Sequence, residues 1–134
     1  MMSAMDEKPT QKWAESRTEP EILRETRSEG PDGPVIELQL RASEDLFQFQ
    51  GHFPGEPILP GVAQLDWVAR LSARYLGCGD HIGKLGQLKF SKLITAGEEL
   101  TLRLAYDTKK NRISFSYRDG TEICSSGYLV LARE

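Results

Sequence analysis

The sequence predicts an α+β domain in which a curved antiparallel sheet of about five to six strands wraps around one long central helix. Stretches with alternating apolar residues follow one another in runs, whereas only residues 62–76 have a helical period. Strands grouped in this way favour an antiparallel sheet over alternating strand-helix units. The length of 134 residues suits one domain. We therefore expect a mobile arm over residues 1–19 and a single domain over residues 20–134.

The first half of the chain predicts an arm and then a hairpin. Residues 1–19 are polar and have no sustained period. Residues 21–27 fit either a short strand or a helical turn, and the glycines and prolines of residues 29–34 predict a turn after them. Residues 35–41 alternate as a half-buried strand does, with one apolar face formed by Ile36, Leu38 and Leu40.

The second half predicts the rest of the sheet. Residues 85–94 fit a strand that ends before a turn at Ala96-Gly97. Residues 100–106 and 113–117 alternate on either side of a polar turn, which predicts a hairpin. After a turn at Asp119-Gly120, residues 123–131 supply a further strand.

The helix is predicted from Val62 to Leu76, because it follows Pro60-Gly61 and stops at Gly77. At about 100° per residue, one apolar stripe contains Val62, Leu65, Ala69, Ala73 and Leu76. Trp67, Leu71 and Tyr75 make the opposite side apolar as well. A helix that is apolar on both sides suits enclosure by a curved sheet.

Asp66 lies at the margin of that apolar stripe. One interpretation is an ordinary surface ion pair with Arg70, one turn later. The other is a functional carboxyl group. The segment that precedes the helix bears on this choice.

That segment, QGHFPGEPILPG, covers residues 50–61 and contains three prolines and three glycines. Its prolines leave the backbone little freedom, and it carries His52 fourteen residues before Asp66. A lone histidine is more often structural or exposed than catalytic. Here, however, a stiff loop leads to a helix N-terminus, where free N–H groups can hold a developing negative charge. A base, an oxyanion donor and a carboxyl group would then converge.

Composition excludes several other classes of protein. The net charge of −3 gives no overall positive field for nucleic-acid binding. The longest uncharged apolar stretch, residues 58–65, is too short to span a membrane, and the first residues lack an apolar signal core. Cys78 and Cys124 lie far apart and predict neither a zinc site nor a disulfide framework. We expect a cytoplasmic protein.

The segment GHFPGEPILPGVAQLD resembles the active-site segment of the 3-hydroxyacyl-acyl-carrier-protein dehydratases of the FabA/FabZ type. The acid is Asp, as in the FabA branch, whereas the FabZ branch has Glu. A second stretch, KFSKLITAGEEL, is similar to a later strand and turn of the family, with Ala96 in place of the usual proline. The sequence VAQLDW is especially similar to the corresponding sequence of dehydratases associated with aryl-polyene pigment clusters. The resemblance covers residues 35–134.

The resemblance implies a hot-dog fold, in which two protomers join their sheets and share two active sites, each with a histidine from one protomer and an acid from the other. The substrate would be an acyl chain on acyl carrier protein, and neither a metal nor a cofactor is implied. A homodimer, a multiple of dimers or a hetero-oligomer with another hot-dog protein would fit. The residue roles carried over are His52 and Asp66 as catalytic groups, Gly61 and Val62 as donors to the thioester, Ile58 as the carbonyl that orients the histidine, and Phe53, Leu59 and Leu65 as walls of the substrate tunnel.

One departure from the family concerns Arg70, which stands where the family usually has glutamine. A guanidinium beside Asp66 would favour the charged carboxylate and oppose a general-acid role. We expect Arg70 to project to the surface, away from Asp66, because an uncompensated guanidinium in an acyl tunnel is costly to desolvate.

The sequence does not decide the roles of His81 and of a group of basic residues. His81 fits an exposed loop residue. Arg70, Arg74, Lys84, Lys89 and Lys92 fit either a docking patch for an acidic carrier protein or a solvated face.

Three functions remain. The leading prediction is dehydration of a (3R)-3-hydroxyacyl thioester to the trans-2-enoyl thioester. A hot-dog acyl thioesterase is the second, although it needs an acid that activates water. The third is a non-catalytic subunit that binds acyl chains or associates with another hot-dog protein. This alternative is kept because Arg70 departs from the family pattern.

Overall fold

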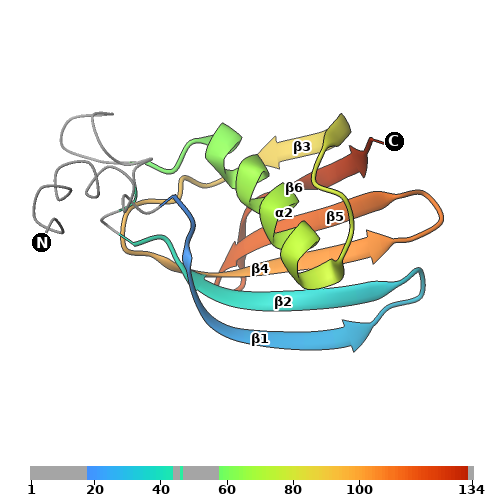
Figure 1. The fold of residues 1–134 in the computed structure, drawn as a ribbon. Coiled ribbons are helices and arrows are strands. Elements are labelled where there is room, and N and C mark those ends of the chain that lie inside the picture. Colours follow the sequence, from blue (N-terminus) through green and yellow to red (C-terminus); the bar gives the residue numbers. More distant parts are fainter. Residues whose placement is uncertain (1–17, 44–45, 47–57, 133–134) are drawn as a thin grey trace, which may run out of the picture.

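The computed structural model describes residues 18–43, 46 and 58–132. Within these residues it contains one helix and six strands (Figure 1). In chain order these are β1 (Glu21–Glu29), β2 (Pro34–Arg41), α2 (Gly61–Leu76), β3 (Ile82–Phe90), β4 (Glu99–Asp107), β5 (Arg112–Asp119) and β6 (Glu122–Leu131).

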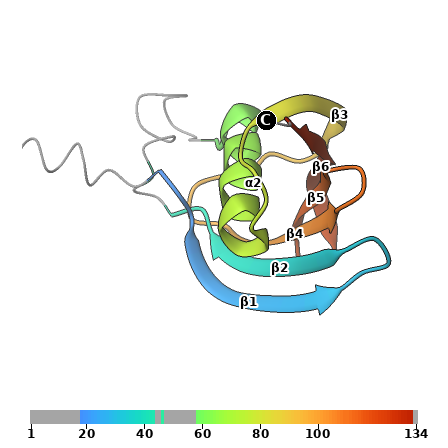
Figure 2. The same ribbon diagram turned by 45° about the vertical axis from the view of Figure 1, so that its right-hand side comes forward.

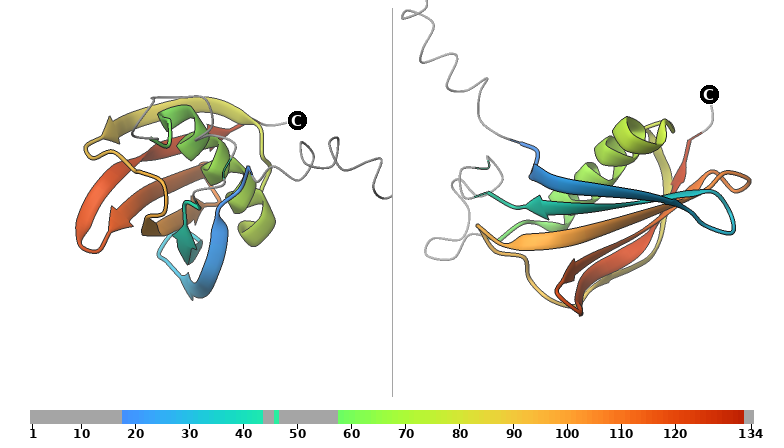
Figure 3. Two further views of the ribbon diagram at one scale, coloured as in Figure 1. Left: turned by 90° about the vertical axis from the view of Figure 1, so that its left-hand side faces the viewer. Right: turned by 90° about the horizontal axis from the view of Figure 1, so that it is seen from below.

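All six strands belong to one antiparallel sheet with the order β1-β2-β4-β5-β6-β3. The sheet curves, and helix α2 lies along its concave side (Figures 2 and 3). The predicted α+β architecture with about six strands is thus confirmed. The prediction of a long helix is not confirmed, because α2 has 16 residues, which is little more than four turns.

The hairpin of β1 and β2 resolves the alternative left open for residues 21–27. They belong to a strand that continues to Glu29, and the predicted turn joins it to β2. In this turn the Gly30 N–H donates to the Gly33 carbonyl at 2.8 Å. Gly33 has a φ of 152°, and a Cβ there would come within 2.2 Å of the Tyr106 carbonyl oxygen. Glycine therefore permits the close approach of this turn to β4.

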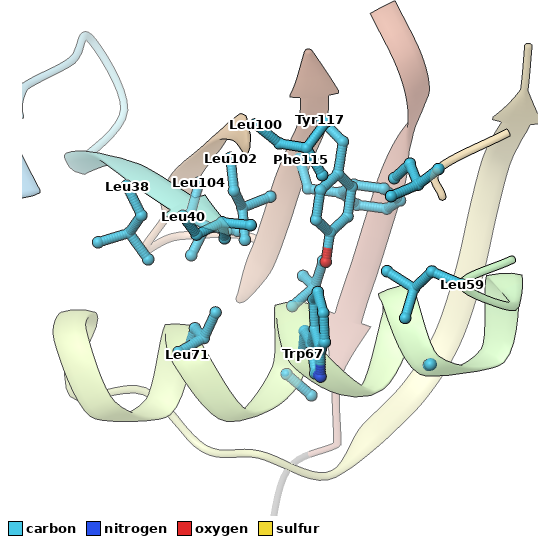
Figure 4. Close-up of a cluster of buried hydrophobic side chains, with 14 of the residues drawn as sticks. Leu38, Leu40, Leu59, Trp67, Leu71, Leu100, Leu102, Leu104, Phe115 and Tyr117 are labelled. Atoms are coloured by element: carbon cyan, nitrogen blue, oxygen red, sulfur yellow. The ribbon is translucent and has the colours of Figure 1, made fainter. Parts of the chain in front are cut away.

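The core lies between α2 and the concave face of the sheet (Figure 4). The alternation seen in the sequence sets this face, since Leu38 on β2 pairs with Leu102 on β4, which in turn pairs with Tyr117 on β5. All three side chains are fully buried. Trp67 and Leu71 of α2 extend toward them (Figure 4).

The buried face of α2 coincides only in part with the stripe that the sequence indicated first, of which Ala69 is buried. Trp67, Val68 and Leu71 are buried, whereas Val62, the first member of the stripe, is 78% exposed. Since the helix is apolar on both sides, periodicity alone could not decide which side packs on the sheet. The side that contains Val62 and Asp66 consequently faces away from the core.

Strand β3 lies at one edge of the sheet, next to β6. It begins and ends earlier than the predicted residues 85–94, and its register with β6 shifts twice, between Ile82 and Lys84 and between Gly86 and Lys89. Two apolar side chains are exposed here: Phe90, the last residue of β3, is 49% exposed, and Leu93, just after the strand, is 63% exposed. An edge with such side chains is suited to cover by another chain.

Candidate active site

The start of helix α2 is the centre of the candidate site. Pro60 occupies the N-cap position with φ −64° and ψ 153°, and among the described residues no side chain caps this end. A helix leaves its first N–H groups without partners inside the helix, and its dipole adds partial positive charge there. Gly61 and Val62 therefore present N–H groups that suit an anionic oxygen.

A pocket of about 370 Å³ opens beside this helix start. Gly61 is part of its wall, and the Phe90 ring lies directly against this glycine, since a Cβ at position 61 would be 3.0 Å from Phe90 Cζ. Most of the lining is apolar, as an acyl chain requires. The lining residues are Ile58, Leu59, Pro60, Gly61, Gln64, Phe90, Ser91, Lys92 and Leu93.

Asp66 follows one turn later on the outward side of α2. Its Oδ2 atom is 2.9 Å from Arg70 Nε, and the two side chains are 46% and 50% exposed. The i,i+4 ion pair is thus present. The expectation that Arg70 turns away from Asp66 is wrong, although Arg70 does lie at the surface; the desolvation argument does not apply, because half of the guanidinium side chain remains in solvent.

Glu19 is a member of this cluster that the sequence did not reveal. Its carboxylate lies 3.7 Å from Arg70 Nη1 and 2.5 Å from Arg74 Nη2. The neighbouring Thr18 carbonyl accepts a hydrogen bond from Trp67 Nε1 at 2.8 Å. The last two residues of the expected arm therefore lie across α2, and Asp66 and Glu19 share the Arg70 guanidinium. The segment had no period that would have placed it there.

Gln64 is a second residue that sequence reasoning missed. It is 4% exposed, and it lines the pocket. Its Nε2 donates to the Leu59 carbonyl at 3.1 Å, and its Oε1 accepts from Ser125 Oγ at 2.7 Å. Its main-chain carbonyl accepts from the Tyr117 hydroxyl at 2.7 Å. The available signal was a long polar side chain on a mostly apolar face of the helix.

Burial raises the pKa of the Tyr117 phenol well above its usual value. The negative charge of Asp66 acts in the same direction. Tyr117 therefore stays protonated and donates its hydrogen to the helix. Its ring also meets Phe115 edge to face, at a centroid distance of 6.0 Å.

The other predicted site residues have varied placements. His52 and Phe53 lie outside the described residues. Leu59 is 1% exposed and forms part of the pocket wall, together with Ile58. Leu65 is half-buried at the margin of the core and does not line this pocket.

The remaining titratable candidates lie apart from the site. The His81 side chain is 76% exposed and lies 3.4 Å from Asp80. Burial raises the pKa of both cysteine thiols, Cys78 and Cys124, which opposes a nucleophilic role. Within residues 18–43, 46 and 58–132, no cluster of three or more His, Cys, Asp or Glu side chains is arranged to hold a metal ion.

Lys92, which lines the pocket, is held by two carboxylates. Its Nζ atom lies 2.5 Å from Asp119 and 3.3 Å from Glu122. The hydrogen bond to Asp119 is the largest cause of the raised pKa of Lys92, and the same bond lowers the pKa of Asp119. Of the five basic residues considered as a docking patch, Arg70, Arg74 and Lys92 are therefore already paired with acids.

In the part of the chain that the structure describes, no helix is long and apolar enough to cross a membrane.

Comparisons with known proteins match this fold and most of this chain. A chain of the solved dehydratase heterocomplex ApeI:P from Xenorhabdus doucetiae is 32% identical, with a TM-score of 0.75 over 86% of this chain and 99% of that one. An uncharacterised protein from Erwinia carotovora subsp. atroseptica is 35% identical, with a TM-score of 0.72 over 82% and 93%. The dehydratase domain of a curacin polyketide synthase module, at 14% identity and a TM-score of 0.53, matches in fold alone, over 88% of this chain and 44% of that one.

Two relatives found by sequence are named for the same enzymatic activity. The 3-hydroxyacyl-[acyl-carrier-protein] dehydratase FabZ of Oenococcus oeni is 32% identical over 96 residues, which are 63% of this chain and 69% of that protein. FabZ of Ligilactobacillus salivarius is 30% identical over 69% of this chain and 72% of its own length.

Fold and relatives together define the class of this protein as a hot-dog dehydratase. The family model described as the ApeI dehydratase matches residues 26–128. The chain belongs to the ApeI-like dehydratase family.

Proposed function

We propose that this protein removes water from (3R)-3-hydroxyacyl thioesters on acyl carrier protein and forms trans-2-enoyl thioesters, in fatty acid or polyene biosynthesis. The main observation behind the proposal is the position of Asp66: it is a half-exposed carboxylate on the helix whose start borders an apolar pocket, and it follows His52 by fourteen residues. Both residues fall within the segment that the ApeI dehydratase model matches. The names of the FabZ relatives support acyl carrier protein as the carrier.

The reaction needs one proton removed at C2 and hydroxide lost from C3. In the proposed roles His52 takes the C2 proton, and Asp66 binds the departing C3 hydroxyl group. This group leaves as water with a proton from Asp66, or, where Asp66 only orients it, with the proton that His52 has taken from C2. The N–H groups of Gly61 and Val62 hold the thioester oxygen, where enolate charge develops. The Ile58 carbonyl accepts a hydrogen bond from the His52 ring and fixes its tautomer. Leu59 and Phe53 line the path of the acyl chain in this proposal, whereas Leu65 lies outside the pocket beside the helix start.

The outward direction of Asp66 supports a site shared between two chains. The exposed side of α2 carries Val62 and Asp66 at a spacing of four residues, so both side chains are offered to a neighbour rather than to the core of their own chain. The exposed apolar residues Phe90 and Leu93 at the β3 edge would be covered in the same assembly.

We accordingly propose a dimer in which His52 of one protomer works with Asp66 of the other. The partner is a second copy or another hot-dog protein; the Xenorhabdus relative is described as a heterocomplex. The cytoplasm is the proposed location.

Arg70 has a place in this scheme because it has two carboxylate partners. When the substrate hydroxyl group takes up a hydrogen-bond position on Asp66, the guanidinium keeps Glu19 as a partner. The guanidinium of Arg70 therefore keeps a carboxylate partner while Asp66 binds the substrate.

One assay separates the three functions considered. The purified protein is incubated with 3-hydroxyacyl carrier protein, and the enoyl thioester and free carrier thiol are measured separately by mass spectrometry. Dehydration gives the enoyl thioester with the thiol still blocked. A thioesterase releases the thiol, and a non-catalytic subunit leaves the substrate intact; either of these two results would overturn the proposal.

A further inference from the structure

Gln64 is an unusual residue to bury beside an acyl pocket. Its side chain is enclosed by the apolar core, and burying a primary amide costs free energy unless its polar atoms are bonded. Both ends of the amide are bonded, to Leu59 on one side and Ser125 on the other. The Leu59 carbonyl can only accept, so the amide nitrogen must face Leu59 and the oxygen must face Ser125.

The bond to Leu59 completes a clamp on the segment before the helix. The Leu59 N–H donates to the Ile94 carbonyl at 2.8 Å, and Ile58 forms an isolated bridge with Thr95. Gln64 holds the opposite side of the same residue through its carbonyl. The N–H and the C=O of Leu59 are therefore both fixed, one by the 94–95 segment and the other by α2.

This clamp determines where the Gly61 N–H points. Only Pro60 separates Leu59 from Gly61, and its ring holds φ near the observed −64°. The Gln64 N–H also donates to the Pro60 carbonyl at 3.1 Å. With Leu59 fixed and Pro60 stiff, the first N–H of the helix has little freedom to move. Gln64 is anchored in turn to β6, through Ser125.

We propose that Gln64 is a positioning residue for the dehydration, which sets the Gly61 N–H against the thioester oxygen by holding the Leu59 carbonyl. The inference rests on the proposed function. It goes beyond it by assigning a role to a side chain that moves no proton and that lies on the opposite side of the helix from Asp66, where Trp67 and Val68 are also buried.

The main test is Gln64→Met, which keeps the length and volume of the side chain but removes the hydrogen bond to Leu59. We expect kcat to fall roughly ten- to a hundredfold, the usual effect of slightly misplacing a catalytic group. KM should change less than about threefold, because the pocket keeps its apolar walls. A purely structural role would lower the melting temperature and leave the kcat of the folded protein unchanged.

Two variants in the same network serve as comparison. Tyr117→Phe removes the bond to the Gln64 main chain and leaves the amide in place, so kcat should stay within twofold of the original protein. Ser125→Ala frees the amide oxygen and loosens the clamp, so kcat should fall several-fold. Ser125→Ala also decides the matter if Gln64→Met does not fold.

The results separate the two levels of the proposal. If the unmodified protein forms enoyl product and folded Gln64→Met retains kcat within twofold, Gln64 has no positioning role. The same conclusion follows if Ser125→Ala and Tyr117→Phe have equal kcat values. If the unmodified protein forms no enoyl product, the proposed function is wrong, and the inference about Gln64 is wrong as well.

Discussion

The substitution Asp66→Asn separates a catalytic role of this carboxylate from a structural one. The side chain makes an ion pair with Arg70, but both partners are about half exposed. Pairs of this kind contribute about 0–1 kcal/mol to stability. In a domain of this size, that corresponds to a shift in melting temperature of no more than roughly 6 °C.

The expected effect on catalysis is much larger. Removing a positioned proton-transfer group lowers the rate by about two to four orders of magnitude, which corresponds to roughly 3–5 kcal/mol in the activation barrier. The kinetic effect should therefore exceed the effect on folding several-fold. The assay follows enoyl formation from 3-hydroxyacyl carrier protein, and calorimetry gives the melting temperature.

Arg70→Gln is the matched control, because it breaks the same ion pair from the other side, and it also removes the longer contact with Glu19. It should lower the melting temperature at least as much as Asp66→Asn does and retain far more activity. If Asp66→Asn keeps turnover within tenfold of the unmodified protein, or if both variants lose activity equally, Asp66 is not the acid of this reaction.

Two further predictions concern stability. Tyr117→Phe should lower the free energy of unfolding by about 1 kcal/mol, the net value of one buried hydrogen bond, since the ring still packs on Phe115; a loss above about 3 kcal/mol in urea unfolding would contradict this reading. Asp119 has a lowered pKa in the folded protein, so its bond to Lys92 stabilises the fold above the unfolded-state pKa of about 3.9, and this contribution disappears as the pH falls through the folded-state value. Asp119→Asn should therefore flatten the decline of the unfolding midpoint below about pH 4; an unchanged slope would show that the pair adds nothing in solution.

Most of the fold was predicted from the alternation of apolar and polar residues along the strands. Leu38, Leu102 and Tyr117 each belong to a strand in which apolar and polar residues alternate. Their side chains meet in the core because side chains point to alternate faces of a sheet with a period of two. The helix was placed correctly to within one residue at its start. The sequence did not indicate which side of the helix is buried, because the helix is apolar on both sides, with Trp67 on one and Leu65 on the other.

The site was predicted where local sequence determines geometry. Pro60 and Gly61 fix the helix start, and the spacing of four residues fixes the contact of Asp66 with Arg70. Glu19 and Ser125 reach the site from distant segments, through contacts that no local pattern records. Gln64 was overlooked because its hydrogen-bond partners come from the loop and the sheet.

Mixing two inactive variants tests the shared dehydratase site most directly. Subunits with His52→Ala and subunits with Asp66→Asn are unfolded and refolded together, and subunit exchange is verified by native mass spectrometry. Half of the dimers should then be mixed, and each mixed dimer should have one complete site out of two, so roughly a quarter of the original dehydration rate should return. If exchange is complete and no activity returns, His52 and Asp66 of two copies do not form a common site.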